Sequence, residues 1–165
     1  MKLSEELVAR GFIHQFSAET LTEILDGEKR TVYHGIDPTA DSAHAGNFVN
    51  WLFLRHLAQH GHQVIFLVGG GTGMIGDPKP DVERPLTPPD VVAERVEKLT
   101  LQAKHLFGDS EIKFVNNHDW LASLNLITFL RDPGKHFTTN ERIKKDALAT
   151  RLASENGISY TEFAY

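Results

Sequence analysis

Three short apolar segments separated by helical patterns constrain the fold of this 165-residue chain most strongly. The segments are TVYHGI at 31–36, QVIFLVG at 63–69 and IKFVNN at 112–117. Between them, residues 45–61 and 88–107 have the apolar spacing of amphipathic helices. This alternation of near-continuous apolar strands with helices predicts a parallel sheet with right-handed crossovers. We therefore expect an α/β protein with a Rossmann-like, doubly wound parallel sheet, of which these strands form the first half.

The ends of the predicted strands are where a binding site is expected. Open parallel sheets bind ligands at the carboxyl ends of their strands, so chemistry should lie after Ile36, Gly69 and Asn117. The segment QVIFLVG is almost continuously apolar, which predicts a strand that is buried on both faces.

Two short helices are expected before the sheet, in SEELVARGF and SAETLTEILDGE, with Ser4 and Ser17 as their N-caps. Residues 1–30 would then pack as N-terminal helices on the domain formed by residues 31–165. Farther along, Gly61 and Gly108 should end the two longer helices, and Thr87 should cap the second.

The composition excludes several classes of protein. The chain has no cysteine, which rules out disulfides and thiolate metal sites, and its net charge of -5 argues against a nucleic-acid footprint over the whole surface. Two early glutamates interrupt any signal peptide, and no apolar run is long enough to span a bilayer. We expect a cytoplasmic protein with no membrane partner.

The glycine-rich stretch LVGGGTGMIGDP contains a G-x-G-x-x-G pattern at Gly71, Gly73 and Gly76. A dinucleotide fingerprint needs a helix to open at the third glycine, but the prolines in DPKPDVERPLTPP exclude one. The lysine of a P-loop is also missing. The glycines would instead let the backbone turn tightly and let a ligand approach it, while the Asp77 carboxylate suits an ammonium group. An Asp-Pro turn without a ligand is the alternative.

The loop YHGIDPTADSAHAGN leads into the next helix with donors near the helix end. Gly46 falls in the first helical turn, and Thr39 and His44 flank it. A hydroxyl, an imidazole and free backbone N–H groups together could bind a phosphate whose charge grows during reaction. Thr39 and His44 could equally serve only as turn and cap residues.

Five motifs together resemble one family. HAGN resembles the H-I-G-H signature of class I aminoacyl-tRNA synthetases, and YHGIDPTADSAHAGN, GGGTGMIGDP, NNHDW, FLRDPGKHF and GISYTEFAY resemble bacterial tyrosyl-tRNA synthetases in content and order. They span residues 33–165. Ala45 replaces a larger aliphatic residue, and Asn47 replaces the second histidine, although its amide can still donate to a ribose.

The resemblance implies ATP-dependent activation of L-tyrosine to tyrosyl-adenylate, followed by transfer to tRNA(Tyr). The residues implied in catalysis are Thr39, His44 and Arg84. Those implied in binding tyrosine are Tyr33, Gly35, Asp37, Asp77, Asn117 and Tyr165. Those implied in binding ATP are His34, Pro38, Gly46 and Asn47. ATP would be a substrate accompanied by Mg2+, with no metal site in the protein. A homodimer contact is implied at 125–160, where an apolar stripe adjoins cations.

Three interpretations stay open at this stage. The chain would be the first half of a catalytic domain, truncated at its carboxyl end and inactive alone. Another H-x-G-H nucleotidyltransferase, or a non-catalytic fragment, is the alternative.

His56 and His60 have i, i+4 spacing, but without a supporting carboxylate they are best explained as favourable charges at a helix C-terminus.

Overall fold

The structure is a computed structural model that describes residues 1–76, 85–143, 149 and 158–165. These residues fall into two compact units. The sheet unit comprises Met1–Ile36, Ala40–Val68 and Glu97–Val115. The strand-end unit comprises the described residues within Asp37–Thr39, Gly69–Val96 and Asn116–Tyr165.

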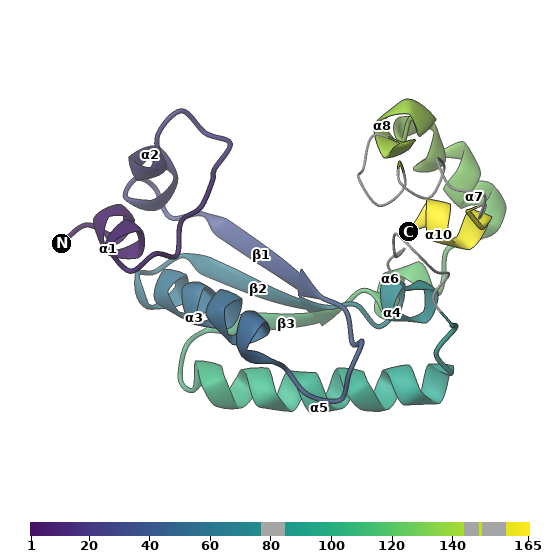
Figure 1. Cartoon of the computed structure of the whole chain (residues 1–165), viewed down its shortest axis with the longest axis horizontal. Helices are drawn as coiled ribbons and strands as arrows, with labels where there is room; N and C mark the ends of the chain where they lie inside the picture. Colours follow the sequence, from purple (N-terminus) through teal and green to yellow (C-terminus); the bar gives the residue numbers. More distant parts are fainter. Residues whose placement is uncertain (77–84, 144–148, 150–157) are drawn as a thin grey trace. The chain divides into compact units, whose positions relative to one another are not determined.

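Three strands form the sheet in the order β1-β2-β3: β1 is Thr31–Ile36, β2 is Gln63–Val68 and β3 is Ile112–Asn116. The first two pair in parallel, in a register that runs from Thr31 opposite Gln63 to Ile36 opposite Val68. In Figure 1 all three arrows point the same way. The predicted parallel α/β sheet is therefore confirmed, with strand bounds that differ from the expected ones by at most one residue.

An aromatic cluster forms the core of the sheet unit. Trp51 from α3, Phe66 from β2 and Phe107 from α5 are each at most 2% exposed. The Trp51 and Phe66 rings lie 5.3 Å apart at 85°, and the Phe66 and Phe107 rings lie 5.5 Å apart at 71°. Edge-to-face packing of this kind is favourable beyond the area that it buries. It attaches both helices to one face of the sheet.

The expectation that β2 is buried on both faces is wrong for the described chain. Val64, Phe66 and Val68 are buried, whereas Ile65 and Leu67 are only partly covered. The physical reason is the alternation of side chains along a strand: α3 and α5 cover one face, and no described element covers the other face to the same degree. The apolar pattern alone does not distinguish a covered face from one that is still open.

The first N-terminal helix, α1 at Leu3–Ala9, begins one residue before the serine that was expected to cap it. Lys2 is the N-cap, and Ser4 lies inside the helix and is buried. The Ser4 N–H donates to Asp26 Oδ1 at 3.0 Å, and its hydroxyl donates to the other carboxylate oxygen. Ser4 therefore joins α1 to the end of the second helix instead of capping its own helix.

The second N-terminal helix, α2 at Leu21–Leu25, is capped by Thr20, whose hydroxyl accepts a backbone N–H, and not by Ser17. The buried His62 ring ties this region to the start of β2. Its Nδ1 accepts the Arg30 N–H at 3.3 Å, and Nε2 lies 3.2 Å from the carbonyl of the last residue of α2. A neutral ring with its proton on Nε2 satisfies both bonds.

The two longer helices agree well with the sequence. Helix α3 spans Ala45–Gln59 and is followed by Gly61 at φ 84°, a left-handed conformation that favours glycine. Helix α5 spans Pro89–Phe107 and is followed by Gly108 at φ 56°. Since α5 begins at Pro89, the residue before it occupies the cap position, and the assignment of Thr87 as N-cap is wrong.

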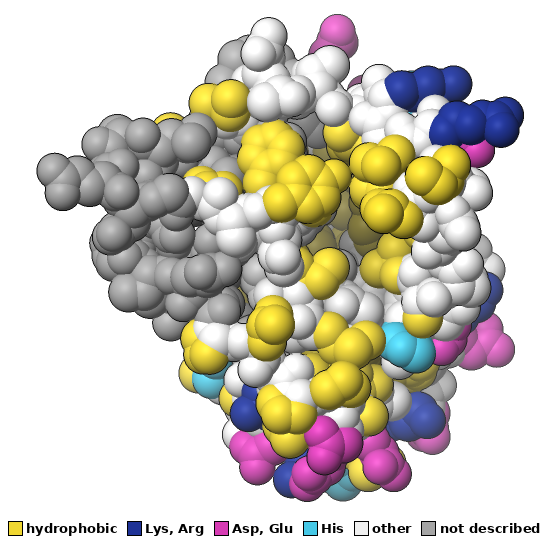
Figure 2. All heavy atoms as spheres, turned by 90° about the vertical axis from the view of Figure 1, so that its right-hand side faces the viewer, with side chains coloured by type: hydrophobic (Ala, Val, Ile, Leu, Met, Phe, Trp, Pro, Cys, Tyr) yellow, Lys and Arg dark blue, Asp and Glu magenta, His cyan; other side chains and the backbone are white. Residues whose placement is uncertain are grey.

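The strand-end unit contains short helical segments. They are α4 (Thr72–Ile75), α6 (His118–Leu121), α7 (Leu126–Arg131), η1 (Gly134–His136), α8 (Thr139–Ile143) and α10 (Tyr160–Ala164). Several large apolar side chains here are exposed, among them Leu126, Ile127, Leu130, Phe137 and Tyr160. Figure 2, which views the side where Figure 1 labels α7 and α10, shows hydrophobic side chains gathered around a hollow. In the part of the chain that the structure describes, no helix has the length and apolar character needed to cross a bilayer.

We predict that Phe66→Ala lowers the free energy of unfolding by about 3–5 kcal/mol, because it empties the centre of the aromatic cluster. Urea unfolding of the purified chain measures the effect. Leu101→Ala, at a residue that is 59% exposed, is the matched control and should change stability by about 0.5 kcal/mol or less. Equal effects of the two substitutions would contradict the assignment of the core.

Candidate functional site

The amino-terminal end of α3 is closed by two side chains that bond each other's backbone. His44 Nδ1 accepts the Asn47 N–H at 3.3 Å, and Asn47 Oδ1 accepts the His44 N–H at 3.0 Å. Because Nδ1 accepts, the proton of the neutral His44 ring lies on Nε2. The capping role is therefore confirmed for His44, and the exposed ring keeps an N–H donor that the cap does not use.

The absence of a side chain at Gly46 has a structural explanation that involves no ligand. A Cβ at this position would lie 3.1 Å from Cε1 and 3.2 Å from Nδ1 of His44, which is tighter than ordinary packing. The missing side chain thus lets the His44 ring fold against the first turn of α3. Thr39, in the strand-end unit, is exposed, and its N–H donates to the Asp37 carbonyl at 2.9 Å.

The three candidate residues of strand β1 lie on the two opposite faces of the sheet. Tyr33 is 75% exposed, and Gly35 shares its face, where a Cβ would lie 3.5 Å from Leu67 Cδ2. His34 points the other way and lies 6.4 Å from the Phe66 ring. Burial lowers the pKa of His34 from its usual value of 6.5, so the ring is neutral at pH 7. The sheet therefore separates Tyr33 from His34.

The strand-end unit brings together three residues that the sequence assigns to tyrosine binding. Asp37 directly follows β1, Asn117 directly follows β3, and Tyr165 ends the chain. Tyr165 donates its hydroxyl to Asp37 Oδ2 at 2.6 Å. Thr72 donates to Asp37 Oδ1 at 2.7 Å and accepts from Asn117 Nδ2 at 2.9 Å. A continuous set of hydrogen bonds therefore joins residues from distant parts of the sequence.

The glycines after β2 make room for this polar set. A Cβ on Gly69 would overlap the Asp37 carboxylate and the Thr72 hydroxyl, and one on Gly70 would overlap the Asn116 side chain. The Gly70 and Gly71 N–H groups donate to the side-chain oxygens of Asn116 at 3.1 Å and Asn117 at 2.7 Å. The protein's own side chains therefore lie against this backbone, and the expected approach of a ligand to the glycines stays a prediction.

Pro38, which the resemblance connects with ATP, is buried and faces the same loop. Its Cδ and Cγ would lie 2.8 Å from a Cβ on Gly73, so Gly73 allows Pro38 to pack against α4. Asp77 and Arg84 lie outside the described residues, as do residues 144–148 and 150–157 of the region expected at a dimer contact.

Thr72 and Asn116 are not among the residues that the sequence analysis assigns to the site. Thr72 is the single polar side chain within GGGTG, and Asn116 adjoins the asparagine that was selected. A polar residue inside a glycine run at a strand end is the signal that could have identified Thr72. Neither contact is visible in the sequence because the partners are 35 and 46 residues apart.

The expectation that no carboxylate supports His56 and His60 is wrong. Glu6 of α1 places its two carboxylate oxygens 3.6 Å from His56 Nε2 and 3.9 Å from His60 Nε2. Arg10 also lies 3.2 Å from the Glu6 carboxylate. His60 Nδ1 lies 2.8 Å from the His56 carbonyl, as expected for a side chain that bonds the last helical turn. Within the described ranges, no three side chains of suitable type are grouped to hold a metal ion.

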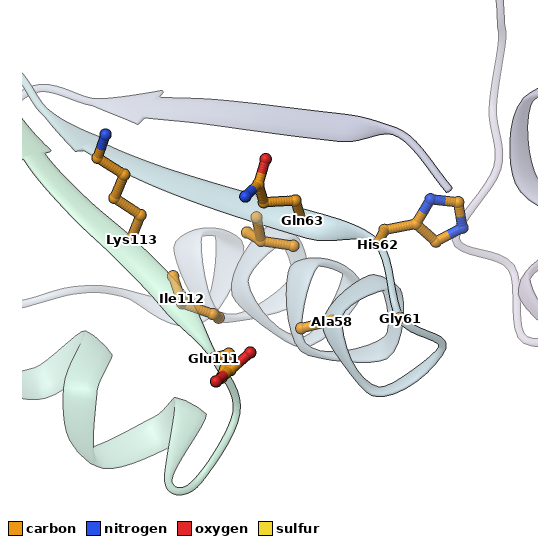
Figure 3. Close-up of a pocket in the computed structure, with 8 residues that line it drawn as sticks. Ala58, Gly61, His62, Gln63, Glu111, Ile112 and Lys113 are labelled. Carbon is orange, nitrogen blue, oxygen red and sulfur yellow. The ribbon is translucent and has the colours of Figure 1, made fainter. Parts of the chain in front are cut away.

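A cavity of about 500 Å³ opens at the amino ends of β2 and β3, away from the ends where this fold binds ligands. Figure 3 shows Gln63 and Lys113 extending from neighbouring strands on the same side of the sheet, with Ala58 and Ile112 on the other side. None of the residues that the sequence analysis assigns to catalysis or to substrate binding lines this cavity. Its size therefore does not identify it as the site of the chemistry.

Comparison with known proteins identifies the family. A family model described as tRNA synthetases class I (W and Y) matches residues 25–165. The chain belongs to this family. It is 48% identical over 167 residues to a tyrosine–tRNA ligase of Bifidobacterium longum (strain DJO10A). This match covers 99% of the present chain and 38% of that relative. It is likewise 48% identical over 165 residues to the tyrosine–tRNA ligase of Leifsonia xyli subsp. xyli, covering 98% of this chain and 37% of that protein.

The solved structures agree with this class I synthetase assignment. A C-terminally truncated mitochondrial tyrosyl-tRNA synthetase of Aspergillus nidulans superposes with a TM-score of 0.84 at 25% identity, covering 99% of this chain and 50% of that one. The Rossmann-like class I fold is therefore confirmed. The class I synthetase chain described here spans about 38% of the length of the curated Bifidobacterium relative.

The lowered pKa of His34 predicts a defined pH dependence. Because the folded-state pKa lies below 6.5, the unfolded chain binds more protons between the two values, and stability rises with pH through that window. The stabilising contribution is complete above pH 6.5 and decreases as the pH falls toward the folded-state pKa. Urea unfolding from pH 7.5 to 5 (roughly the range of histidine titration) should show wild type losing stability relative to His34→Gln. An NMR titration midpoint for His34 at or above 6.5 would contradict this prediction.

Proposed function

We propose that this chain supplies the amino-terminal part of the activation site of a tyrosine–tRNA ligase. The activity is ATP-dependent formation of tyrosyl-adenylate from L-tyrosine, followed by transfer of the tyrosyl group to tRNA(Tyr). Family membership and the 48% identity to tyrosine–tRNA ligases support this reading. The observation that carries it is the convergence of Asp37, Asn117 and Tyr165 in one hydrogen-bonded set.

In this proposal the substrate is the nucleophile. A carboxylate oxygen of tyrosine attacks the α-phosphorus of ATP, an O–P bond forms, and the bond from the α-phosphorus to the bridging oxygen breaks as pyrophosphate leaves. No protein side chain needs to form a covalent bond. The protein contributes by positioning the two reactants and by donating hydrogen bonds to the phosphates as their charge grows.

His44, the N-cap residue of α3, is one of three proposed phosphate donors. His44 donates through Nε2, since its Nδ1 is already used by the cap. Thr39 donates its hydroxyl, and Arg84 is proposed as a further cation although it lies outside the described residues. Gly46 and Pro38 are proposed to border the nucleotide, with His34 and Asn47 contacting ribose. The neutral state of His34 suits a ribose hydroxyl better than a phosphate.

The proposed tyrosine contacts use groups with defined donor and acceptor roles. Tyr165 donates a hydrogen bond to Asp37 through its hydroxyl, so the lone pairs of its phenolic oxygen are available to accept from the substrate ammonium. Asp77 is proposed as the second ammonium partner. Tyr33 is proposed to meet the substrate hydroxyl, with Gly35 leaving space beside it. Mg2+ is proposed to arrive on the ATP phosphates; among the described residues, no group of three or more His, Asp or Glu side chains could hold a metal ion.

A homodimer is the proposed assembly, through the region 125–160. The described part of that region exposes large apolar side chains: Leu126 at 63%, Ile127 at 69%, Phe137 at 68% and Tyr160 at 66%. Exposed apolar groups gathered in this way are typical of protein interfaces. A second copy of the chain fits an isologous contact because the same patch would serve both partners.

We predict that the full-length protein containing this chain catalyses exchange between pyrophosphate and ATP in the presence of L-tyrosine. L-phenylalanine and L-tryptophan serve as controls and should support much less exchange. Residues 1–165 assayed alone should show little exchange, because catalysis requires donors that act together in a closed site. Exchange that requires a carboxylic acid other than tyrosine would favour a different nucleotidyltransferase. A folded full-length protein without any exchange would favour a non-catalytic role.

We also predict that the full-length protein sediments as a dimer and that Ile127→Glu shifts it toward monomer. The reason is that dimerisation would bury the new carboxylate without a partner, which costs free energy. Sedimentation velocity measures the change. Leu101→Glu is the matched control, since Leu101 is 59% exposed but belongs to the sheet unit. A wild-type protein that is already monomeric, or equal behaviour of the two variants, would contradict the proposed interface.

A further inference from the structure

Thr72 has an unusual position in the strand-end unit because its hydroxyl lies between two residues of the proposed tyrosine site. Its oxygen is 2.7 Å from Asp37 Oδ1 and 2.9 Å from Asn117 Nδ2. Thr72 begins α4, directly after Gly71. It is therefore held by the backbone of the glycine loop, and its side chain connects the segments that follow β1 and β3.

In each hydrogen bond around Thr72, the neighbouring groups determine which partner is the donor and which is the acceptor. The Gly71 N–H donates to an oxygen of the Asn117 side chain at 2.7 Å, which requires Oδ1 at that place and turns Nδ2 toward Thr72. Because Asn117 Nδ2 is a donor, the Thr72 oxygen must accept from it. The single hydroxyl proton of Thr72 is then directed at the Asp37 carboxylate. Asn117 is only 6% exposed, so an unpaired amide there would be costly.

Asp37 is held at both carboxylate oxygens. Thr72 donates to Oδ1 and Tyr165 donates to Oδ2. Gly69 lies against the same carboxylate, and a Cβ there would overlap Oδ1. The carboxylate is thus confined by two donors and by the backbone, and in this orientation it accepts the Tyr165 hydroxyl.

We infer that Thr72 is a positioning residue for recognition of the tyrosine ammonium. It acts through Asp37, which fixes the Tyr165 hydroxyl and so aims the lone pairs of that oxygen. The inference rests on the proposed function and extends it to a residue that touches no substrate atom. Loss of the Thr72 hydroxyl should release Asp37 and weaken tyrosine recognition while leaving ATP recognition intact.

The test is steady-state ATP–pyrophosphate exchange by the full-length protein with Thr72→Val, which keeps the shape but removes the hydroxyl. The KM for tyrosine should rise by roughly ten- to a hundredfold, the range for a lost hydrogen bond to a charged group. The KM for ATP should change little. Thr72→Ser, which keeps the hydroxyl, should recover most of the loss. Thr22→Val, at an exposed threonine of α2, is the control for the substitution itself.

A double-mutant cycle separates positioning from a structural effect. If Thr72 acts through Asp37, Thr72→Val should cost nothing further in an Asp37→Ala background. An additive loss, or an equal rise in both KM values, would overturn the inference, as would an unchanged tyrosine KM in Thr72→Val.

Thr72→Ala is measured in parallel with urea unfolding of each variant, so that a folding defect in one variant does not decide the result. If the wild-type protein shows no tyrosine-dependent exchange, the proposed function fails first; if wild type is active and Thr72→Val is normal, only the inference fails.

Discussion

Parallel pairing of β1 with β2 is the constraint on which the rest of the structure depends. In a parallel sheet every strand ends at the same edge, so the segments that follow the strands meet although they are far apart in the sequence. The aromatic packing of Trp51, Phe66 and Phe107 secures this arrangement by attaching α3 and α5 to one face. The polar residues Asp37 and Asn117, which follow β1 and β3, do not belong to this aromatic cluster and bond instead to Thr72.

The strand-end unit uses those polar residues as a set of fixed donors and acceptors. Backbone N–H groups of the glycine loop orient the asparagine amides, and the amide of Asn117 in turn orients the Thr72 hydroxyl. Buried polar groups of this kind must be paired, and pairing leaves each one a single orientation. This arrangement suits chemistry in which two substrates react with each other and the protein holds them in place.

Much of the fold could be predicted from the sequence because it depends on local patterns. Strand bounds, the glycines that end α3 and α5, and the parallel order all follow from hydrophobic spacing and backbone preferences. Helix starts were less predictable: Ser4 bonds to Asp26 instead of capping α1, because an acceptor 22 residues away is available only in the folded chain. The carboxylate near His56 and His60 was missed for the same reason, since Glu6 belongs to a different helix.

By itself, the sequence determined the α/β class, the family motifs and the side chains available for chemistry, because these are properties of residue type and short-range spacing. Only the tertiary structure decided which of those side chains meet. It joined Asp37 to Tyr165 across 128 residues through a direct hydrogen bond, and it brought the Gly71 N–H to the Asn117 side chain across 46 residues. It also placed the Thr72 hydroxyl between Asp37 and Asn117, where it donates to the first and accepts from the second. Such contacts arise from the positions of strand ends in space, which no local pattern encodes.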